Sequence, residues 1–291
     1  MKTLTFLNNK GGVGKTTSAT AIAHMLSEVH HKKVLICDMD PQGNTSNLFG
    51  NTDFVALFKA RMECDILSYR ISMGDLLTDT NMDVHSAIHH TAYKGLDIIP
   101  SMPTLSAVEE RLKADIKMPQ QFRLKNQLEK LQDEYDYCII DCSPSLSILN
   151  VNALVATDEV YLPTLVDDGS LFGVELTKSE LIEEIRKYAP ALKIGGIFFT
   201  KYKGWTNVSK YSKELLETVY NNEVLPITIS DNIIVSESTH NHMPLLAYDK
   251  GRNKSKATMD YLRLTEYIAA PNRKAFLKRL QNRQAERNGM S

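Results

Sequence analysis

The first residues that could do chemistry form a glycine-rich stretch with a lysine at each end, KGGVGKTT, from Lys10 to Thr17. Small residues let backbone N–H groups turn inward around phosphate oxygens, and a helix that starts after the last glycine directs its positive dipole end at the same anion. Lys15 would then reach the β- and γ-phosphates of a nucleotide, and the hydroxyl of Thr16 would bind Mg²⁺. The stretch fits G-x-x-x-x-G-K-[ST] in a modified form, without the first glycine. The candidate nucleotide-binding residues are Lys10, Gly11, Gly12, Val13, Gly14, Lys15, Thr16 and Thr17.

Carboxylates lie at the ends of two apolar stretches. Asp141 lies near the end of YCIIDC, and Asp38 and Asp40 lie near the end of VLICDMD. Carboxylates at strand ends that face phosphates can hold the Mg²⁺ shell or orient an attacking water. Acids in plain surface turns are the alternative, but the end of a buried strand is a costly place for a charge without a task. The pattern indicates a Mg²⁺ site shared by Asp141 and Thr16, with Asp38 and Asp40 beside it.

The elements that position these residues follow from the apolar pattern. Continuous apolar runs of strand length alternate with helical segments, and continuous runs are typical of strands covered on both faces. We therefore predict an α/β fold: a mostly parallel, twisted sheet with helices on both faces and ligands at the carboxyl ends of the strands. The predicted strands are residues 4–9, 34–40, 96–100, 137–142, 159–165, 193–202 and 223–229, and helices are expected around 19–26, over 171–188 and over 207–222.

The composition limits the classes of protein. The chain has 291 residues, 43% of them hydrophobic, which is enough for one large domain or two small ones. Its net charge of −1 argues neither for nor against a nucleic-acid partner. We expect a cytosolic protein, because no run of roughly 18 apolar residues predicts a spanning helix and the N-terminus does not read as a signal peptide. The cysteines, which lack a CxxC spacing and are expected to be buried thiols, are Cys37, Cys64, Cys138 and Cys142.

Two segments depart from the strand and helix alternation. Residues 51–95 mix short helical signals with polar breaks, and we expect a helical insertion at the surface. His85, His89 and His90 lie in this segment, and a metal site made by them is the alternative. Residues 271–291 form a basic tail that starts at a proline.

Three motifs together resemble the deviant Walker-A ATPases of the ParA/MinD class: KGGVGKTT, VLICDMDPQGNTS and YCIIDCSPSL. DPQGNTS is similar to the block of ParA, the plasmid- and chromosome-partitioning ATPases, rather than to that of MinD. The resemblance spans about residues 2–268 and includes NIIVSES and MPLLAYDKGRNKSKA. It implies a P-loop NTPase, with an ATPase domain over residues 1–270 and with ATP and Mg²⁺ as cofactors.

The resemblance also implies roles for single residues. Lys10 is the signature lysine of the family, and by resemblance it crosses a dimer interface to the phosphates of the ATP bound by the partner subunit. A cation delivered in this way neutralises charge that develops in phosphoryl transfer, as an arginine finger does. Asp40 matches a carboxylate tied to hydrolysis, Asp38 matches one in the Mg²⁺ shell, and Thr200 falls near the adenine side. The catalytic candidates are Lys10, Lys15 and Asp40, and the metal candidates are Thr16, Asp38 and Asp141.

The family's DNA-binding surface does not transfer residue by residue. Trp205 in TKYKGWTN occupies a usual arginine position, and Asp231 and Ile234 replace arginines in SDNIIVSE. PTLVDDGSLFG also differs from the family's usual glutamine- and tyrosine-containing run. The basic residues that could bind DNA instead are Lys201, Lys203, Arg273, Lys274, Lys278 and Arg279.

The basic tail permits three interpretations. As a solvated helix it would pack Phe276, Leu277 and Leu280 on the core. Alternatively it binds DNA phosphates, or it binds a membrane, because AFLKRL is similar to the membrane-targeting tail of MinD. Three apolar residues make only a short membrane anchor, and the ParA-like DPQGNTS block favours DNA.

By this resemblance the sequence predicts an ATP-dependent switch that segregates a plasmid or a chromosome. ATP closes two subunits into a homodimer, the dimer binds DNA non-specifically, and a ParB-type centromere-binding protein stimulates weak hydrolysis. We expect the protein in the cytoplasm, on the nucleoid, and we expect a short form that lacks an N-terminal helix-turn-helix domain. The alternative is a membrane-cycling positioning ATPase of the MinD type. A metabolic enzyme on the same fold is disfavoured, because no paired cysteines suggest an iron–sulfur cluster and no second substrate signature is present.

Overall fold

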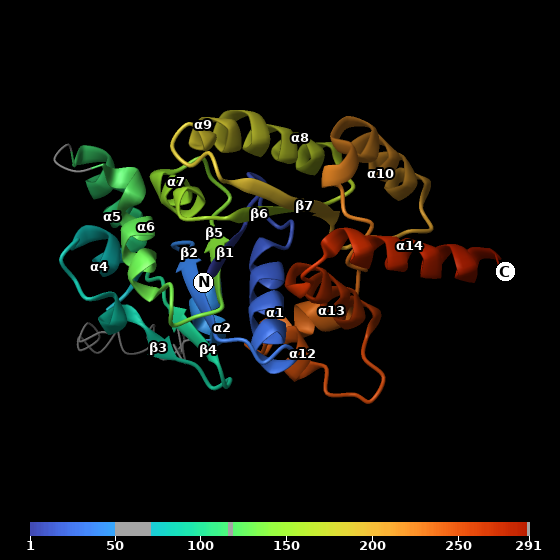
Figure 1. Cartoon of the computed structure of the whole chain (residues 1–291), viewed down its shortest axis with the longest axis horizontal. Helices are drawn as coiled ribbons and strands as arrows, with labels where there is room; N and C mark the ends of the chain where they lie inside the picture. The colour runs from blue at the N-terminus through green and yellow to red at the C-terminus, as the bar shows by residue number, and fades with distance from the viewer. Residues whose placement is uncertain (50–70, 116–118, 290–291) are drawn as a thin grey trace.

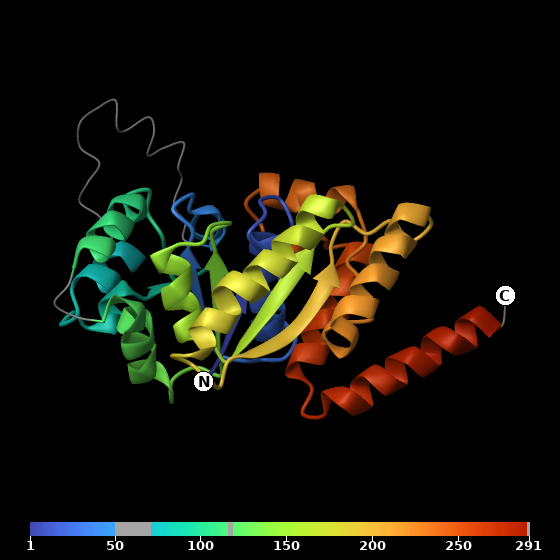
Figure 2. The same cartoon turned by 90° about the horizontal axis from the view of Figure 1, so that it is seen from above.

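A twisted β-sheet runs through the middle of the molecule (Figures 1 and 2). The computed structural model describes residues 1–49, 71–115 and 119–289. Over these residues the strands form one seven-stranded sheet in the order β3-β4-β2-β5-β1-β6-β7, parallel throughout except that β3 pairs antiparallel with β4. The strands are β1 (Lys2–Phe6), β2 (Val34–Met39), β3 (His89–His90), β4 (Leu96–Ile99), β5 (Tyr137–Cys142), β6 (Glu159–Thr164) and β7 (Lys193–Phe199).

Helices connect the parallel strands. The α-helices are α1 (Lys15–Glu28), α2 (Asn44–Phe49), α4 (Met73–Thr78), α5 (Leu105–Ala114), α6 (Arg123–Leu128), α7 (Ile148–Val155), α8 (Asp168–Leu176), α9 (Glu183–Arg186), α10 (Asn207–Tyr220), α11 (Ile233–His240), α12 (Leu245–Tyr248), α13 (Lys256–Ala269) and α14 (Arg273–Gly289). The short turns of other helical types are η1 (Val84–Ala87), η2 (Gln120–Phe122), η3 (Glu129–Leu131), η4 (Thr177–Ile182) and η5 (Asn221–Glu223).

Side chains alternate along the strands between two buried clusters, one on each face of the sheet. In β2, Leu35 and Cys37 belong to one cluster, and Val34 and Ile36 belong to the other. Helices α7 and α8 cover the first face, and α1 and α13 cover the second (Figure 1). A strand covered on both faces needs an apolar residue at almost every position, which explains the continuous apolar runs. The predicted α/β fold with helices on both faces is confirmed.

The strand register brings the ends of three central strands together. Phe6 of β1 and Asp38 of β2 both pair with Asp141 of β5. Because the glycine-rich stretch follows β1 directly, it leaves the sheet next to the acidic end of β5, and the acidic end of β2 lies one strand further on. We call this side, where the parallel strands end, the carboxyl edge of the sheet, and the opposite side the amino edge.

The strand predicted over residues 223–229 is wrong. The segment runs beside β7 but makes only isolated bridges. The N–H groups of Leu225 and Ile229 donate to carbonyls of β7 that are only two residues apart, at 2.8 and 2.7 Å. The segment therefore bulges between these two bonds, around Pro226, which has no N–H to give to a ladder.

The described part of residues 51–95 differs from the expected surface helical insertion. Residues 51–70 lie outside the described residues, and the rest comprises α4, η1 and the edge strand β3. Met73, Leu76 and Leu77 of α4 have helical spacing, and all three are buried in the core. This part of the segment is therefore packed into the fold.

The three histidines of this segment make separate contacts. His85 lies between the carboxylates of Asp83 and Glu134, at 2.8 Å from each, whereas His89 and His90 have other partners. No group of three or more potential metal ligands occurs among the residues that the structure describes.

The described cysteines are buried free thiols, as expected; they are Cys37, Cys138 and Cys142, while Cys64 lies outside the described residues. Within the described ranges, no helix is both long and apolar enough to span a bilayer.

The basic tail forms α14, which projects from the body of the molecule (Figure 2). Near its start, Phe276, Leu277 and Leu280 are partly buried against the cluster that α1 and α13 share. The apolar face of the tail thus packs on the core.

Candidate nucleotide-binding site

The glycine-rich stretch forms a loop between β1 and α1. Gly12 and Gly14 have φ values of 75° and 85°, a left-handed conformation that other residues adopt only with strain. Gly14 is the N-cap of α1, and the helix begins at Lys15. The loop therefore places the positive end of a helix where an anion could bind.

Lys15 is held inside the loop that it follows. Its amine donates to the carbonyl of Lys10 at 2.9 Å, and only 6% of the residue is exposed. Burial lowers the pKa of Lys15, and the nearby carboxylate of Asp141 opposes this shift. A desolvated ammonium group is stabilised by a bound anion, so this geometry fits a phosphate group.

Two carboxylates lie side by side beneath the loop. Asp38 and Asp141 are paired across β2 and β5, and both are fully buried. Burial raises the pKa of both, and the proximity of Asp141 raises that of Asp38 further. Two buried acids in contact favour either a proton or a cation between them.

The donor set at these acids fits Mg²⁺. Asp38 accepts hydrogen bonds from the N–H and the hydroxyl of Ser46, at 2.8 and 2.7 Å. One oxygen of Asp141 accepts from the hydroxyl of Thr45 at 2.8 Å, but the other, Oδ1, is buried without a hydrogen-bond partner. A hard cation binds such an oxygen well. A hydrogen bond from the hydroxyl of Thr16 also lowers the pKa of Asp141, so Thr16 and Asp141 are the residues that would hold the ion. Through its bonds to Ser46, Asp38 holds the segment that follows β2 beside this site.

Asp40 lies in the loop that follows β2. It is 8% exposed, and its carboxylate accepts a hydrogen bond from the N–H of Gln42 at 2.9 Å. Its charge acts on the amine of Lys15. The structure thus brings Asp40 close to the phosphate loop, where it could orient a water.

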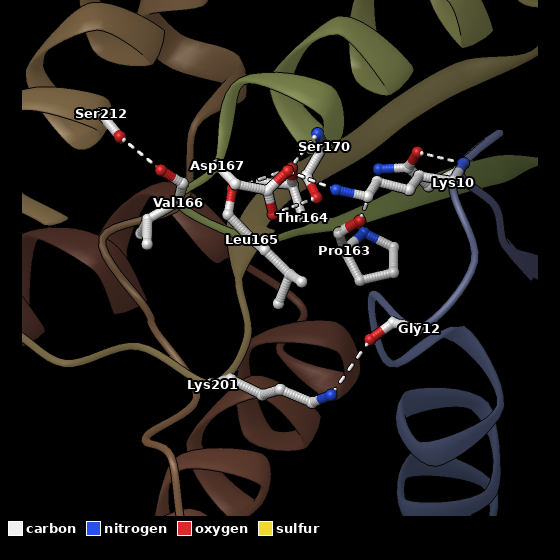
Figure 3. A network of polar contacts seen from close by, with 11 residues as sticks. Lys10, Gly12, Pro163, Thr164, Leu165, Val166, Asp167, Ser170, Lys201 and Ser212 are labelled. Carbon is white, nitrogen blue, oxygen red and sulfur yellow. Dashed lines mark hydrogen bonds and ion pairs between the residues drawn. The ribbon is translucent and has the colours of Figure 1, made fainter. Parts of the chain in front are cut away.

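Lys10 has a different environment from Lys15. Its N–H donates to the side chain of Asn8 at 3.0 Å, and its amine forms an ion pair with Asp167, just before α8 (Figure 3). The side chains of Lys10 and Asp167 are 38% and 46% exposed. The front lysine therefore lies at the surface of the site rather than inside it.

A cleft beside the loop could take the rest of a nucleotide. Thr200 lines it, and its hydroxyl donates to the carbonyl of Val13 at 2.8 Å. The cleft is also lined by Thr17, Ile229, Ser230, Asn232 and Tyr261. The placement of Thr200 on the adenine side stays a prediction, but Thr200 does contact the phosphate loop.

The basic residues predicted to bind DNA do not form one patch. Lys201 donates to the carbonyl of Gly12 at 3.2 Å, at the carboxyl edge. Lys203 pairs with Asp231 at 3.2 Å. Arg273 pairs at 2.7 Å with Glu159, the first residue of β6, at the amino edge. The side chains of this set that are exposed and form no ion pair in the described part of the chain are Lys201, Lys274, Lys278 and Arg279.

Sequence reasoning missed Asp167 and its contact with Lys10. A local signal for the start of α8 exists, because Asp167 accepts a hydrogen bond from the N–H of Ser170 as a helix N-cap. Nothing local connects Asp167 with Lys10, which lies 157 residues away in the sequence.

The fold and the site together define a P-loop NTPase: a mostly parallel sheet, a glycine-rich phosphate loop after β1, and acids at the ends of β5 and β2, the next two strands on one side of β1. A family model described as an AAA domain matches residues 1–194. The "Chromosome-partitioning ATPase Soj" of Treponema pallidum is 33% identical over 248 residues, which is 85% of this chain and 90% of that protein. The "Sporulation initiation inhibitor protein Soj" of Bacillus subtilis is 32% identical over 92% of this chain and 98% of its own length. The chain belongs to the ParA family of partitioning ATPases.

Solved structures extend the comparison. A plasmid partition protein from Borrelia burgdorferi has a TM-score of 0.63 and 27% identity, over 90% of this chain and 96% of that chain. Cobyrinic acid a,c-diamide synthase from Mycobacterium smegmatis, solved with bound ADP and magnesium, has a TM-score of 0.72 and 25% identity, over 92% of this chain and 94% of that chain. The same fold therefore serves partition and biosynthesis, so function must be argued from the site.

Proposed function

We propose that this protein is a DNA-partitioning switch that binds ATP with Mg²⁺, dimerises on ATP and then binds DNA non-specifically. Its weak ATP hydrolysis is stimulated by a ParB-type centromere-binding partner, and it works in the cytoplasm on the nucleoid. The relatives named as partitioning ATPases support the biological role. The site supports the chemistry.

One observation carries the proposal: the two lysines of the loop have different environments. Lys15 is buried, and its amine bonds within the loop, which suits a cation that binds phosphate in its own subunit. Lys10 is partly exposed at the front of the loop, and its amine bonds to a separate segment. A second cation at the surface suits delivery to the nucleotide of another copy, and two-fold symmetry makes that delivery reciprocal.

Each residue of the site then has a task. The N–H groups of the loop and Lys15 bind the phosphates, while Thr16 and Asp141 hold Mg²⁺, which neutralises phosphate charge when it is bound. Asp40 accepts a hydrogen bond from the attacking water and so orients it. Lys10 brings a positive charge from the partner subunit to the charge that develops in the transition state.

The tail helix supports DNA over a membrane as the second ligand. Phe276, Leu277 and Leu280 are already packed on the core, so they are not free to enter a bilayer. Lys274 and Lys278 remain exposed beside them. Exposed cations without an available apolar face suit a phosphate backbone.

Lys10→Ala tests the dimeric mechanism. The variant should still bind nucleotide through Lys15, but its partner-stimulated turnover should fall by about 10³-fold, the lower range for a cation delivered in trans. Nucleotide affinity is followed with a fluorescent ATP analogue, and turnover by phosphate release. Turnover equal to that of the unmodified protein would exclude a role for Lys10 across an interface.

A binding comparison tests the role of DNA. The full chain is incubated with non-specific duplex DNA and, separately, with anionic vesicles, each with and without ATP and Mg²⁺. We expect ATP-dependent binding to DNA alone. ATP-dependent vesicle binding without DNA binding would replace the partition proposal by a membrane-cycling ATPase.

A further inference from the structure

The amine of Lys10 is already engaged in the single chain (Figure 3). Asp167, its partner, is also the N-cap of α8 and accepts hydrogen bonds from the N–H and the hydroxyl of Ser170, at 3.0 and 2.8 Å. These two bonds hold the carboxylate in place independently of its contact with Lys10. Asp167 is therefore a preorganised acceptor, and not a loose surface acid that happens to lie nearby.

Helix α8 is shaped to receive the front of the phosphate loop. A Cβ atom on Gly169 would lie 3.2 Å from the amine of Lys10, and one on Gly173 would lie 2.5 Å from the side-chain oxygen of Asn8. Most side chains would therefore push Asn8 and Lys10 away from the helix. The two glycines thus let Asn8 and Lys10 approach α8 closely, next to Asp167 at the start of the helix.

A third contact continues along the same side of the helix. The N–H of Asn9 donates to the hydroxyl of Thr177 at 3.1 Å, and this hydroxyl donates to the carbonyl of Gly173 at 2.6 Å. Thr177 begins a π-helical turn, η4, which continues α8. Lys10, Asn8 and Asn9 thus contact successive positions along α8 and the start of η4, whereas the amine of Lys15 bonds to a carbonyl of its own loop.

We propose that Asp167 is a positioning residue that holds Lys10 in its own subunit and so opposes dimerisation until ATP draws Lys10 across the interface. This inference rests on the proposed function, because it assumes that Lys10 acts in trans. While Lys10 is paired with Asp167, a carboxylate compensates the charge that Lys10 would offer to a second nucleotide. The triphosphate of the partner, which carries more negative charge than one carboxylate, competes for the same amine.

The exposure of the pair sets the size of the effect. A pair with side chains 38% and 46% exposed is well screened by water, so breaking it corresponds to about a threefold change in an equilibrium constant. Dimerisation breaks the contact in both copies. Removing Asp167 should therefore tighten the dimer about tenfold, which is large enough to measure and small enough for ATP to overcome.

Asp167→Asn tests the proposal with the full chain. Asparagine keeps the N-cap of α8 but removes the charge that holds Lys10. The matched control is Asp168→Asn, which removes the same charge one residue later, from an exposed side chain with no ion pair in the described ranges. The dimer dissociation constant is measured by analytical ultracentrifugation with Mg²⁺ and the non-hydrolysable analogue AMPPNP.

We expect Asp167→Asn to dimerise about tenfold more tightly than the unmodified protein, and Asp168→Asn to differ from it by less than twofold. Raising the salt concentration from about 0.05 to about 0.5 M should reduce the difference between the dimer dissociation constants of Asp167→Asn and the unmodified protein. The reason is that salt screens the ion pair of Lys10 and Asp167, which only the unmodified protein has. A merely structural role for Asp167 would not give this salt dependence. Asp167→Ser, which also caps a helix, replaces Asp167→Asn if the latter unfolds.

The outcomes separate the two proposals. If the unmodified protein dimerises but Asp167→Asn is equal or weaker, Asp167 does not restrain Lys10, and only this inference is lost. A weaker dimer would mean that Asp167 presents Lys10 to the partner instead. If all three proteins stay monomeric with AMPPNP at every concentration, the proposed function fails first.

Discussion

At the scale of single residues, the two lysines of the phosphate loop differ in their exposure to solvent, and this difference suits them to different functions. Lys15 is buried, so its ammonium group is stabilised when an anion binds beside it. Lys10 already has a half-exposed carboxylate partner, and an exposed ion pair is easily exchanged. The buried lysine therefore suits permanent phosphate binding, and the exposed one suits an event that depends on a second molecule.

Asp40→Ala should separate binding from hydrolysis. The carboxylate of Asp40 accepts a hydrogen bond from the N–H of Gln42 and lies near Lys15, so its contact with the phosphate loop is electrostatic. Its loss should leave ATP binding and dimerisation intact and slow turnover by about 10²-fold or more, the usual contribution of a group that positions or deprotonates the nucleophile. Single-turnover hydrolysis and ultracentrifugation with ATP measure the two effects, and unchanged turnover would remove Asp40 from the mechanism.

His24 gives a prediction about acid stability. It lies on α1, 2% exposed, with its ring edge-on to that of Tyr93, and its Nδ1 has no hydrogen-bond partner. Burial lowers the pKa of His24 to about 4, because the imidazolium form is desolvated. In the unfolded chain His24 has a pKa of about 6.5, so the unfolded state binds more protons than the folded state in this range. The free energy of unfolding therefore decreases as pH falls from about 6.5 to about 4.

His24→Leu should remove that loss. Between pH 7.5 and pH 5 the unmodified protein should lose about 2 kcal/mol more stability than the variant. Urea unfolding at the two pH values measures it. The other histidines are present in both proteins, so their contributions cancel in the difference, and equal losses in both proteins would show that His24 is not the acid-sensitive group.

At the scale of elements, the sequence predicted most strands because their signal is local. A strand such as β5, buried on both faces, is apolar up to Asp141, the acid of the site, which lies one residue before its end. The start of α1 was also predictable, because the last glycine of the loop and the helix that follows are adjacent in sequence. The phosphate loop and its acids therefore needed no knowledge of distant contacts.

The elements that escaped prediction depend on distant partners. The segment around Pro226 is apolar enough for a strand, but its pairing with β7 is interrupted by a residue without an N–H. The glycines of α8 read as poor helix formers, and the close approach of Lys10 to Gly169 and of Asn8 to Gly173 explains them. Contacts between residues more than 150 positions apart leave no periodicity in the sequence.

The start of α14 gives the prediction at this scale. Arg273 bonds to Glu159 at 2.7 Å and to the carbonyl of Ile268 at 2.9 Å, and it lies over the ring of Tyr267. Arg273→Met should destabilise the protein by about 1–3 kcal/mol, because it leaves partly buried acceptors with fewer donors. It should also speed tryptic cleavage of α14.

Lys274→Met is the matched control for Arg273→Met. Lys274 is the exposed neighbour of Arg273, and within the described ranges it forms no ion pair, so its substitution should change stability by less than about 0.5 kcal/mol. Thermal unfolding and protease kinetics compare the two variants. Equal behaviour would mean that Arg273 does not anchor the helix.

At the scale of the whole molecule, the sheet separates two kinds of basic residue. Lys201 lies at the carboxyl edge with the phosphate loop, whereas Arg273 anchors α14 at the amino edge. Figure 2 shows α14 projecting away from the body of the molecule. A DNA surface on α14 would therefore be distinct from the nucleotide site, so the proposed dimer could hold ATP and DNA at the same time.

The salt dependence of DNA binding tests that arrangement. Each phosphate contact changes the slope of log K against log salt concentration by about −0.9, so the triple variant Lys274→Gln, Lys278→Gln, Arg279→Gln should flatten the slope by about 2.7 if all three contact phosphates. ATPase activity without DNA should not change, because these residues lie away from the nucleotide site.

A second triple variant separates a local DNA surface from a general effect of charge. Lys113→Gln, Lys187→Gln and Lys210→Gln together remove the same charge from exposed positions on or next to α5, α9 and α10. Net charge alone would shift DNA affinity equally in both variants. A flatter slope only in the tail variant would assign the phosphate contacts to α14. Equal slopes in all three proteins would contradict a DNA surface on α14. Lys201, at the carboxyl edge, would then be the next residue to replace.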